Sequence, residues 1–122
     1  MSEHVAQAQL VARCRHLRQG LLLFAIPNGG VRDKRTAVRL RAEGVLAGVP
    51  DLLLAESRMG YHGMFIEMKA EDQRRPSSVR PIQRRVHEML RRRGYRVVVA
   101  YGVEEGWRAV CEYLDGEEDP LS

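Results

Sequence analysis

Three charged residues in two short apolar segments could together bind a metal ion and activate water. Asp51 lies within residues 48–54, and Glu67 and Lys69 lie at the end of residues 64–69. Carboxylate oxygens are the ligands that Mg²⁺ prefers, and this ion keeps several of its waters when a protein binds it. A neighbouring ammonium group could orient or deprotonate one such water. The alternative is an exposed ion pair between Glu67 and Lys69, because charged side chains usually stay solvated.

The two segments have the length and apolar character of β-strands. The linker between them, residues 56–63, contains two glycines, so we expect an antiparallel hairpin. Alternation along the second strand places Phe65, Glu67 and Lys69 on one face, with Glu67 and Lys69 roughly 7 Å apart. The open ends of the two strands coincide, which brings Asp51 beside Glu67 and Lys69.

The remaining segments predict further helices and strands around this hairpin. Helices are expected at residues 3–18, at residues 33–43, from a cap at Ser77 or Ser78 to Gly94, and at residues 103–114, with strands at residues 21–26 and 95–101. The inward stripes of the first and third helices are expected at Leu10, Val11, Cys14 and Leu17, and at Ile82, Val86, Met89 and Leu90. Residues 70–75 show no periodicity and predict a mobile loop over the charged residues.

Length and composition favour one domain that is not inserted in a membrane. The chain has 122 residues, which predicts a single domain at residues 1–114 and an acidic flexible tail at residues 115–122. No apolar run approaches the roughly 18 residues of a membrane span, and the first residues do not resemble a signal peptide, so a cytoplasmic location is expected. Cys14 and Cys111 are expected as free thiols, because a reducing compartment disfavours disulfides.

The charge distribution favours a polyanionic partner. The net charge is +4 and almost all positive charge is arginine, since Lys34 and Lys69 are the only lysines. Acidic residues gather near the end of the chain, so the folded body is more basic than the total suggests. Arginine binds phosphate in a bidentate manner, which favours nucleic acid as the partner. The alternative is that arginine merely serves as the surface charge of this chain.

Pro50-Asp51, followed by Glu67-x-Lys69, resembles the signature of the PD-(D/E)XK nucleases. Further residues in the same order make the resemblance more specific. These are Gly48-Val49-Pro50-Asp51-Leu52-Leu53-Leu54, Phe65-Ile66-Glu67-Met68-Lys69, Ser77-Ser78, Gln83 and Gly94. Together they resemble the virus-type replication-repair nuclease (VRR-NUC) domain between Glu3 and Leu114. The resemblance implies an α/β fold, namely a restriction-endonuclease-like three-layer sandwich with a mixed central sheet.

The resemblance also implies the roles of particular residues. Asp51, Glu67 and the backbone carbonyl of Met68 are expected to bind Mg²⁺ or Mn²⁺, and Lys69 is expected to act on the attacking water. Gln83 is expected to face the cleft and orient water or phosphate, although a solvated helix glutamine is the alternative. Glu3 is a further candidate ligand, and its alternative role is a first-turn acid that stabilises its helix. The loop Asn28-Gly29-Gly30 could lie against a DNA backbone, or could simply form a turn.

The function that the resemblance implies is a Mg²⁺-dependent endodeoxyribonuclease. We expect a homodimeric Holliday-junction resolvase that cleaves branched DNA in a bacterial cell, encoded by the bacterium or by a phage, without a membrane partner. Alternatives are a flap or nicking endonuclease that acts as a monomer, a non-catalytic basic DNA-binding module, and a small structural or regulatory protein. Cleavage that requires a divalent metal would separate the enzymes from the other classes.

Overall fold

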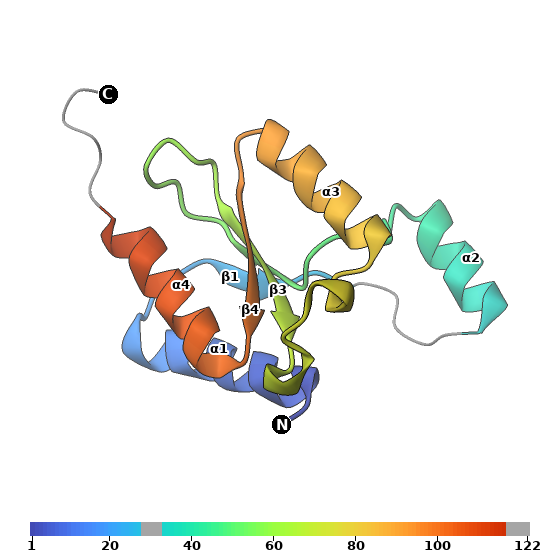
Figure 1. Ribbon diagram of the computed structural model, residues 1–122. Coiled ribbons are helices and arrows are strands. Elements are labelled where there is room, and N and C mark those ends of the chain that lie inside the picture. The colour runs from blue at the N-terminus through green and yellow to red at the C-terminus, as the bar shows by residue number, and fades with distance from the viewer. Residues whose placement is uncertain (28–32, 117–122) are drawn as a thin grey trace.

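A mixed four-stranded sheet lies between two layers of helices (Figure 1). The computed structural model describes residues 1–27 and 33–116. Its helices are α1 (Glu3–Leu17), α2 (Lys34–Ala42), α3 (Pro81–Arg92) and α4 (Val103–Asp115), its strands are β1 (Leu23–Ala25), β2 (Leu52–Leu54), β3 (Met64–Lys69) and β4 (Arg96–Tyr101), and two short 3₁₀ helices are η1 (Glu71–Gln73) and η2 (Pro76–Ser78). The expected fold class, an α/β sandwich with a mixed central sheet, is confirmed.

The strands follow the chain order β1-β2-β3-β4 across the sheet. The predicted hairpin is confirmed, because β2 and β3 pair antiparallel with Leu52 opposite Ile66. Strand β4 pairs parallel with β3. Strand β3, which carries Glu67 and Lys69, is therefore an inner strand that is paired on both sides.

Strand β3 is buried on both faces. Met64, Ile66 and Met68 are at most 1% exposed and pack in the main core with α1 and α4. Phe65, Glu67 and Lys69 are also buried on the other face, where Lys69 contacts Gln83 and Glu67 contacts His87 of α3. Helix α3 lies on the opposite side of the sheet from α1 and α4 (Figure 1). Two charged residues are therefore buried beneath a helix. The alternative of an exposed ion pair is wrong.

The first helix and strand are less buried than the sequence predicted. Helix α1 buries only Ala6, Leu10 and Cys14, whereas Leu17 is 59% exposed. At about 100° per residue Leu17 has nearly the direction of Leu10, so its place in the last turn explains its exposure. Strand β1 is shorter than expected and lies at the sheet edge, where Phe24 is 41% exposed.

Helix α3 begins later and buries a different stripe than predicted. Ser77 and Ser78 do not cap it, because they belong to η2 and the Ser78 hydroxyl hydrogen-bonds the Tyr101 hydroxyl at 2.9 Å. Met89 is 41% exposed. The buried residues of α3 are Gln83, Val86 and His87. The inward face of α3 is therefore partly polar.

The segment between β3 and α3 contains local structure where we predicted an irregular loop. Helices η1 and η2 occupy much of it, and the Arg74 guanidinium lies 5.1 Å from the centre of the Tyr101 ring. Arg74 also forms an ion pair with Glu105 of α4. These contacts attach the segment to the end of β4. The prediction that it is mobile stays untested.

Three other predictions concern the periphery of the fold. Asp33 caps α2 as predicted, since its Oδ1 accepts the Thr36 N–H at 2.8 Å. Helix α4 continues through Asp115, one residue into the predicted tail, and residues 117–122 and the loop at residues 28–30 lie outside the described residues. Cys14 and Cys111 are free thiols as expected. No helix among the described residues is long and apolar enough to cross a membrane.

Candidate active site

Asp51 and Glu67 lie opposite each other on neighbouring strands. Leu52 pairs with Ile66, so one further step along the antiparallel pair places Asp51 opposite Glu67, with both side chains on the same face. The backbone of Asp51 is also fixed from the other side, because the Ile26 N–H donates to its carbonyl at 2.8 Å. The predicted approach of the two carboxylates therefore follows from the sheet register.

Gly48 lets the chain pass closely beneath α3 before it enters β2. Its φ is +93°, and a Cβ added there would lie 2.7 Å from the Ile82 carbonyl oxygen and 3.0 Å from Val86 Cγ2. A larger residue would meet backbone atoms of the helix in a conformation that favours glycine. Gly48 thus fixes the distance between α3 and the strand that carries Asp51.

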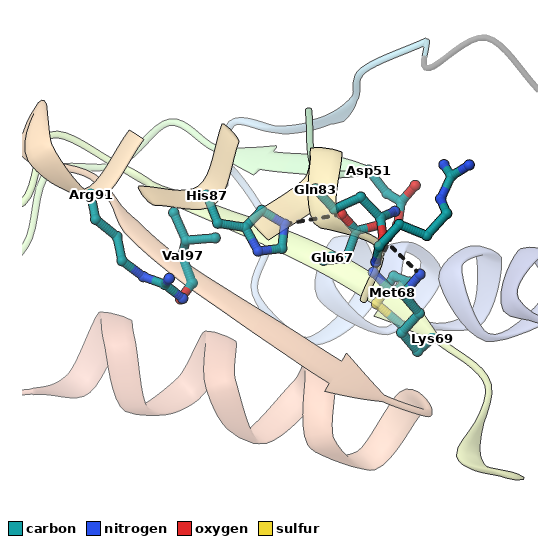
Figure 2. A network of polar contacts seen from close by, with 9 residues as sticks. Asp51, Glu67, Met68, Lys69, Gln83, His87, Arg91 and Val97 are labelled. Atoms are coloured by element: carbon teal, nitrogen blue, oxygen red, sulfur yellow. Dashed lines mark hydrogen bonds and ion pairs between the residues drawn. The ribbon is translucent and has the colours of Figure 1, made fainter. Parts of the chain in front are cut away.

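Helix α3 places polar side chains above the charged residues of β3 (Figure 2). Lys69 Nζ donates to Gln83 Oε1 at 3.2 Å, and His87 Nε2 lies 3.2 Å from Glu67 Oε1. Gln83 and His87 are four residues apart on α3, which is a rise of about 6 Å. Glu67 and Lys69 are two residues apart on β3, which is a rise of about 6.6 Å. The two helix side chains are therefore spaced to meet the two strand side chains. Gln83 Oε1 also accepts the Arg80 N–H at 2.9 Å, which closes the first turn of the helix.

The Asp51 and Glu67 carboxyl groups repel each other where little water reaches them. Burial, followed by the charge of Glu67 and a hydrogen bond with it, raises the pKa of Asp51 to about 7, while the Met68 N–H and Lys69 oppose this shift. Burial also raises the pKa of Glu67, against the effects of Asp51 and Lys69. Below about pH 7 Asp51 therefore favours the form that holds a proton. A divalent cation could replace that proton and relieve the repulsion.

His87 contacts Glu67 as a neutral imidazole, so it adds no charge to the site. Burial, Arg91 and Lys69 lower the pKa of His87 to about 4, so the imidazole is neutral near pH 7. With Glu67 ionised, as cation binding requires, its carboxylate can only accept a hydrogen bond, and Nε2 is then the ring nitrogen that carries the proton.

The donor atoms fit an ion of the magnesium class. The described residues contain no group of three or more His, Cys, Asp or Glu side chains placed to hold one ion. Two carboxylates nevertheless suit Mg²⁺, which proteins commonly bind through one or two carboxylates together with waters and substrate phosphates. Glu3 raises the pKa of Glu67 through its charge. Its expected role as a direct ligand stays a prediction.

The peptide group of Met68 faces the side of β3 on which Asp51 lies. The carbonyls of Gly63 and Lys69 accept hydrogen bonds from the N–H groups of Arg96 and Gly102, at the start of β4 and just after its end. Backbone groups alternate in direction along a strand, so the N–H and the carbonyl of Met68 point away from β4. The Met68 N–H indeed donates to Asp51 Oδ2 at 2.7 Å. The Met68 carbonyl is thus on the correct side to serve as the predicted ligand.

His87 is a residue of this site that the sequence did not predict. None of the four histidines has the spacing of metal ligands, so histidine spacing indicated no functional role for it. One feature of the sequence could have indicated His87. Gln83 and His87 are four residues apart and so share one helix face, which could lie against the two charged residues of the predicted strand, Glu67 and Lys69. Gln83 was found, but the structure places its amide oxygen against Lys69, where we expected contact with water or phosphate.

The mixed sheet, its helical layers and the acidic pair beside a lysine define a nuclease-type α/β domain. A sequence model described as VRR-NUC domain matches residues 7–104, and the chain belongs to this family. A solved structure described as a VRR_NUC domain protein has a TM-score of 0.78 and 27% sequence identity, over 98% of this chain and 93% of that chain. Comparison with curated proteins gives no significant match. Membership implies a DNA substrate, and domains of this kind generally use divalent metal ions.

Proposed function

We propose that the chain is a Mg²⁺- or Mn²⁺-dependent endonuclease that hydrolyses phosphodiester bonds in branched DNA, acting as a homodimeric Holliday-junction resolvase in a bacterial or phage-infected cell. The observation that carries the nuclease chemistry is the pair formed by the partly buried Asp51 and the buried Glu67 beside Lys69. Neighbouring acidic groups whose pKa values are raised by burial are typical of functional sites. The substrate geometry rests on the two-fold symmetry that a junction and a homodimer share.

Each residue of the site has a distinct proposed task. Asp51, Glu67 and the Met68 carbonyl hold the ion, with Glu3 assisting from α1. When bound, the ion polarises the scissile phosphate and lowers the pKa of the attacking water. Lys69 orients that water or accepts its proton. Gln83 fixes the direction of the Lys69 amine through the hydrogen bond of 3.2 Å.

Arginines on α3 are the proposed contacts to the DNA backbone. Arg80 and Arg85 are exposed, and the described residues provide no ion-pair partner for either. Arg80 stands at the start of the helix, close enough that its charge lowers the pKa of Glu67. A phosphate held by Arg80 would therefore lie beside the acidic pair. Arginine suits this task because its planar fork matches phosphate oxygens.

We expect Arg80→Ala to weaken binding to all DNA substrates alike. Loss of one phosphate contact should reduce the slope of log K against log salt concentration by about 1. Fluorescence anisotropy over a salt series in Ca²⁺ or EDTA measures this slope without cleavage. Arg108→Ala is the control, because Arg108 is exposed on α4 in the opposite layer. Equal slopes for the wild type and Arg80→Ala would remove Arg80 from the DNA interface.

A single cleavage experiment tests the proposed function. Labelled duplex, single strand, flap and four-way junction are incubated with the protein in Mg²⁺, Mn²⁺ or EDTA. We expect paired symmetric cuts in the junction with Mg²⁺ or Mn²⁺, 5′-phosphate ends, and no product in EDTA. Sedimentation with and without the junction should show two chains on each junction.

The remaining outcomes separate the alternatives. Cutting of flaps or nicking of duplex by a single chain would replace the resolvase with a monomeric endonuclease. DNA binding without any cleavage would indicate a non-catalytic module, and neither binding nor cleavage would reject a nucleic-acid function.

A further inference from the structure

Among the described residues, His87 is the buried polar side chain at the acidic pair for which the proposed chemistry provides no task. Its side chain is 3% exposed and that of Glu67 is 2% exposed, so both are closed to water. Nε2 approaches Glu67 Oε1 to 3.2 Å, and Figure 2 shows the ring directed from α3 onto the carboxylate. A buried donor and a buried acceptor at this distance restrict the rotation of both side chains.

We propose that His87 is a positioning residue that holds the Glu67 carboxylate in the orientation required for a divalent cation. This inference rests on the proposed function and adds to it. Oε1 is occupied by the imidazole, so the other oxygen is the one directed away from His87 and available to the ion. Hydrogen bonds to metal-ligating carboxylates commonly have this orienting effect, and their removal typically costs 10–100-fold in metal affinity or activity.

The helix register gives His87 its place. Gln83 and His87 follow one another by one turn on the buried face of α3, above Lys69 and Glu67 respectively. The helix thereby fixes the two charged side chains of β3 with two separate hydrogen bonds. Displacement of α3 would change both contacts together. Removal of the imidazole alone changes only the contact to Glu67.

The test measures Mn²⁺ binding in the absence of DNA, by isothermal titration calorimetry or electron paramagnetic resonance. His87→Leu removes the donor and should weaken Mn²⁺ binding by about 10–100-fold. His87→Gln should bind Mn²⁺ nearly as well as the wild type, because its amide nitrogen stands the same number of bonds from Cα as Nε2. The Mg²⁺ concentration for half-maximal cleavage should rise similarly in His87→Leu, with kcat largely recovered at saturating Mg²⁺.

The matched control is Val86→Ala, which truncates the neighbouring buried residue of α3 without touching Glu67. It should lower the melting temperature and leave Mn²⁺ affinity unchanged. Equal loss of affinity in Val86→Ala and His87→Leu would reduce His87 to a packing residue. Wild-type affinity in His87→Leu, or weak binding in a folded His87→Gln, would overturn the proposal.

A measurement on the wild-type protein covers the case in which His87→Leu does not fold. Nitrogen-15 NMR of the imidazole should show the proton on Nε2, and a proton on Nδ1 alone would contradict donation to Glu67. The proposed nuclease function and the role of His87 can be rejected separately. If the wild type neither binds Mn²⁺ nor cuts DNA, the proposed function fails and the role of His87 fails with it. If it does both and His87→Leu matches it, only the role of His87 is wrong.

Discussion

Asp51→Asn is expected to lower the rate of DNA cleavage by about a thousandfold or more, equivalent to about 4 kcal/mol of transition-state stabilisation. The substitution keeps the shape of the side chain and removes the negative charge that a divalent cation requires. Mn²⁺ binding without DNA should fall in parallel. Single-turnover cleavage with the enzyme in saturating excess over DNA and calorimetric titration of Mn²⁺ measure the two effects separately.

The fold should survive this substitution. Asp51 Oδ2 accepts the Met68 N–H at 2.7 Å, and the amide oxygen of asparagine can accept the same hydrogen bond. The backbone contact from Ile26 does not involve the side chain. DNA binding in EDTA should therefore stay near the wild-type value. Asp72→Asn is the matched control, because Asp72 is an exposed acid on η1.

The pH dependence of stability provides a second readout for Asp51. Its pKa is about 7 in the folded protein against an ordinary value of 3.8, so the folded state binds the extra proton between these values. The stability that this proton contributes is fully present below pH 3.8 and is lost as the pH rises through about 7. In EDTA, Asp51→Asn should lack this component. The wild type loses this stability at high pH and Asp51→Asn does not. The melting temperature of Asp51→Asn should therefore exceed that of the wild type by more at pH 8 than at pH 4.

Two outcomes would contradict the role of Asp51. Cleavage by Asp51→Asn at the wild-type rate would show that another group binds the ion. Loss of folding in Asp51→Asn would indicate that the carboxylate is a structural element and would leave the nuclease site to be sought elsewhere.

The hairpin and its acidic pair could be predicted from the sequence because strand alternation and antiparallel pairing leave few arrangements. A side-chain period of two fixes which residues of β3 share a face, and the apolar length of β2 fixes the register to within one step. Asp51, Glu67 and Lys69 then converge for geometric reasons.

The polar face of α3 could not be predicted by the same reasoning. An apolar stripe assumes that a helix covers an apolar surface, but α3 covers Glu67 and Lys69. Gln83 and His87 are buried there because the strand offers them charged partners, while Met89 turns to solvent. A buried polar face on one element becomes visible only when the polar face of its partner is known. At the functional site, contacts with β3 determine which residues of α3 are buried, and the apolar pattern of the helix does not.

The start of α3 shows a related effect. Ser77 and Ser78 have the residue type of a cap, yet the helix begins at Pro81, and Gln83 accepts the Arg80 N–H at 2.9 Å. The glutamine thus satisfies the helix terminus and contacts Lys69 with the same oxygen. Local cap preferences gave the wrong residue because the functional side chain also satisfies the terminus.

Lys69→Met is expected to abolish turnover while metal binding persists. Methionine retains most of the apolar length of lysine, and Gln83 Oε1 keeps the Arg80 N–H as a partner, so the fold should be maintained. Removal of the amine removes the group that acts on water, and proton-transfer groups of this kind typically contribute 10²–10⁴-fold. The single-turnover rate constant of cleavage, with the enzyme in saturating excess over DNA and at saturating Mg²⁺, should fall by that factor.

The charge of Lys69 makes the expected effect on metal binding opposite in sign to that of Asp51→Asn. Lys69 lowers the pKa of both Asp51 and Glu67, which means that its positive charge acts on the carboxylates. The same charge repels a divalent cation held between them. Mn²⁺ affinity in Lys69→Met should therefore equal or exceed that of the wild type.

Lys34→Met is the control, because Lys34 is the other lysine of the chain and is exposed on α2. It should leave the cleavage rate at saturating DNA unchanged. Wild-type cleavage by Lys69→Met would remove Lys69 from the chemistry. Loss of Mn²⁺ binding in Lys69→Met would show instead that the ammonium group only keeps the acidic pair in place. The combination of tight metal binding and absent turnover is the result that separates activation of water from support of the carboxylates.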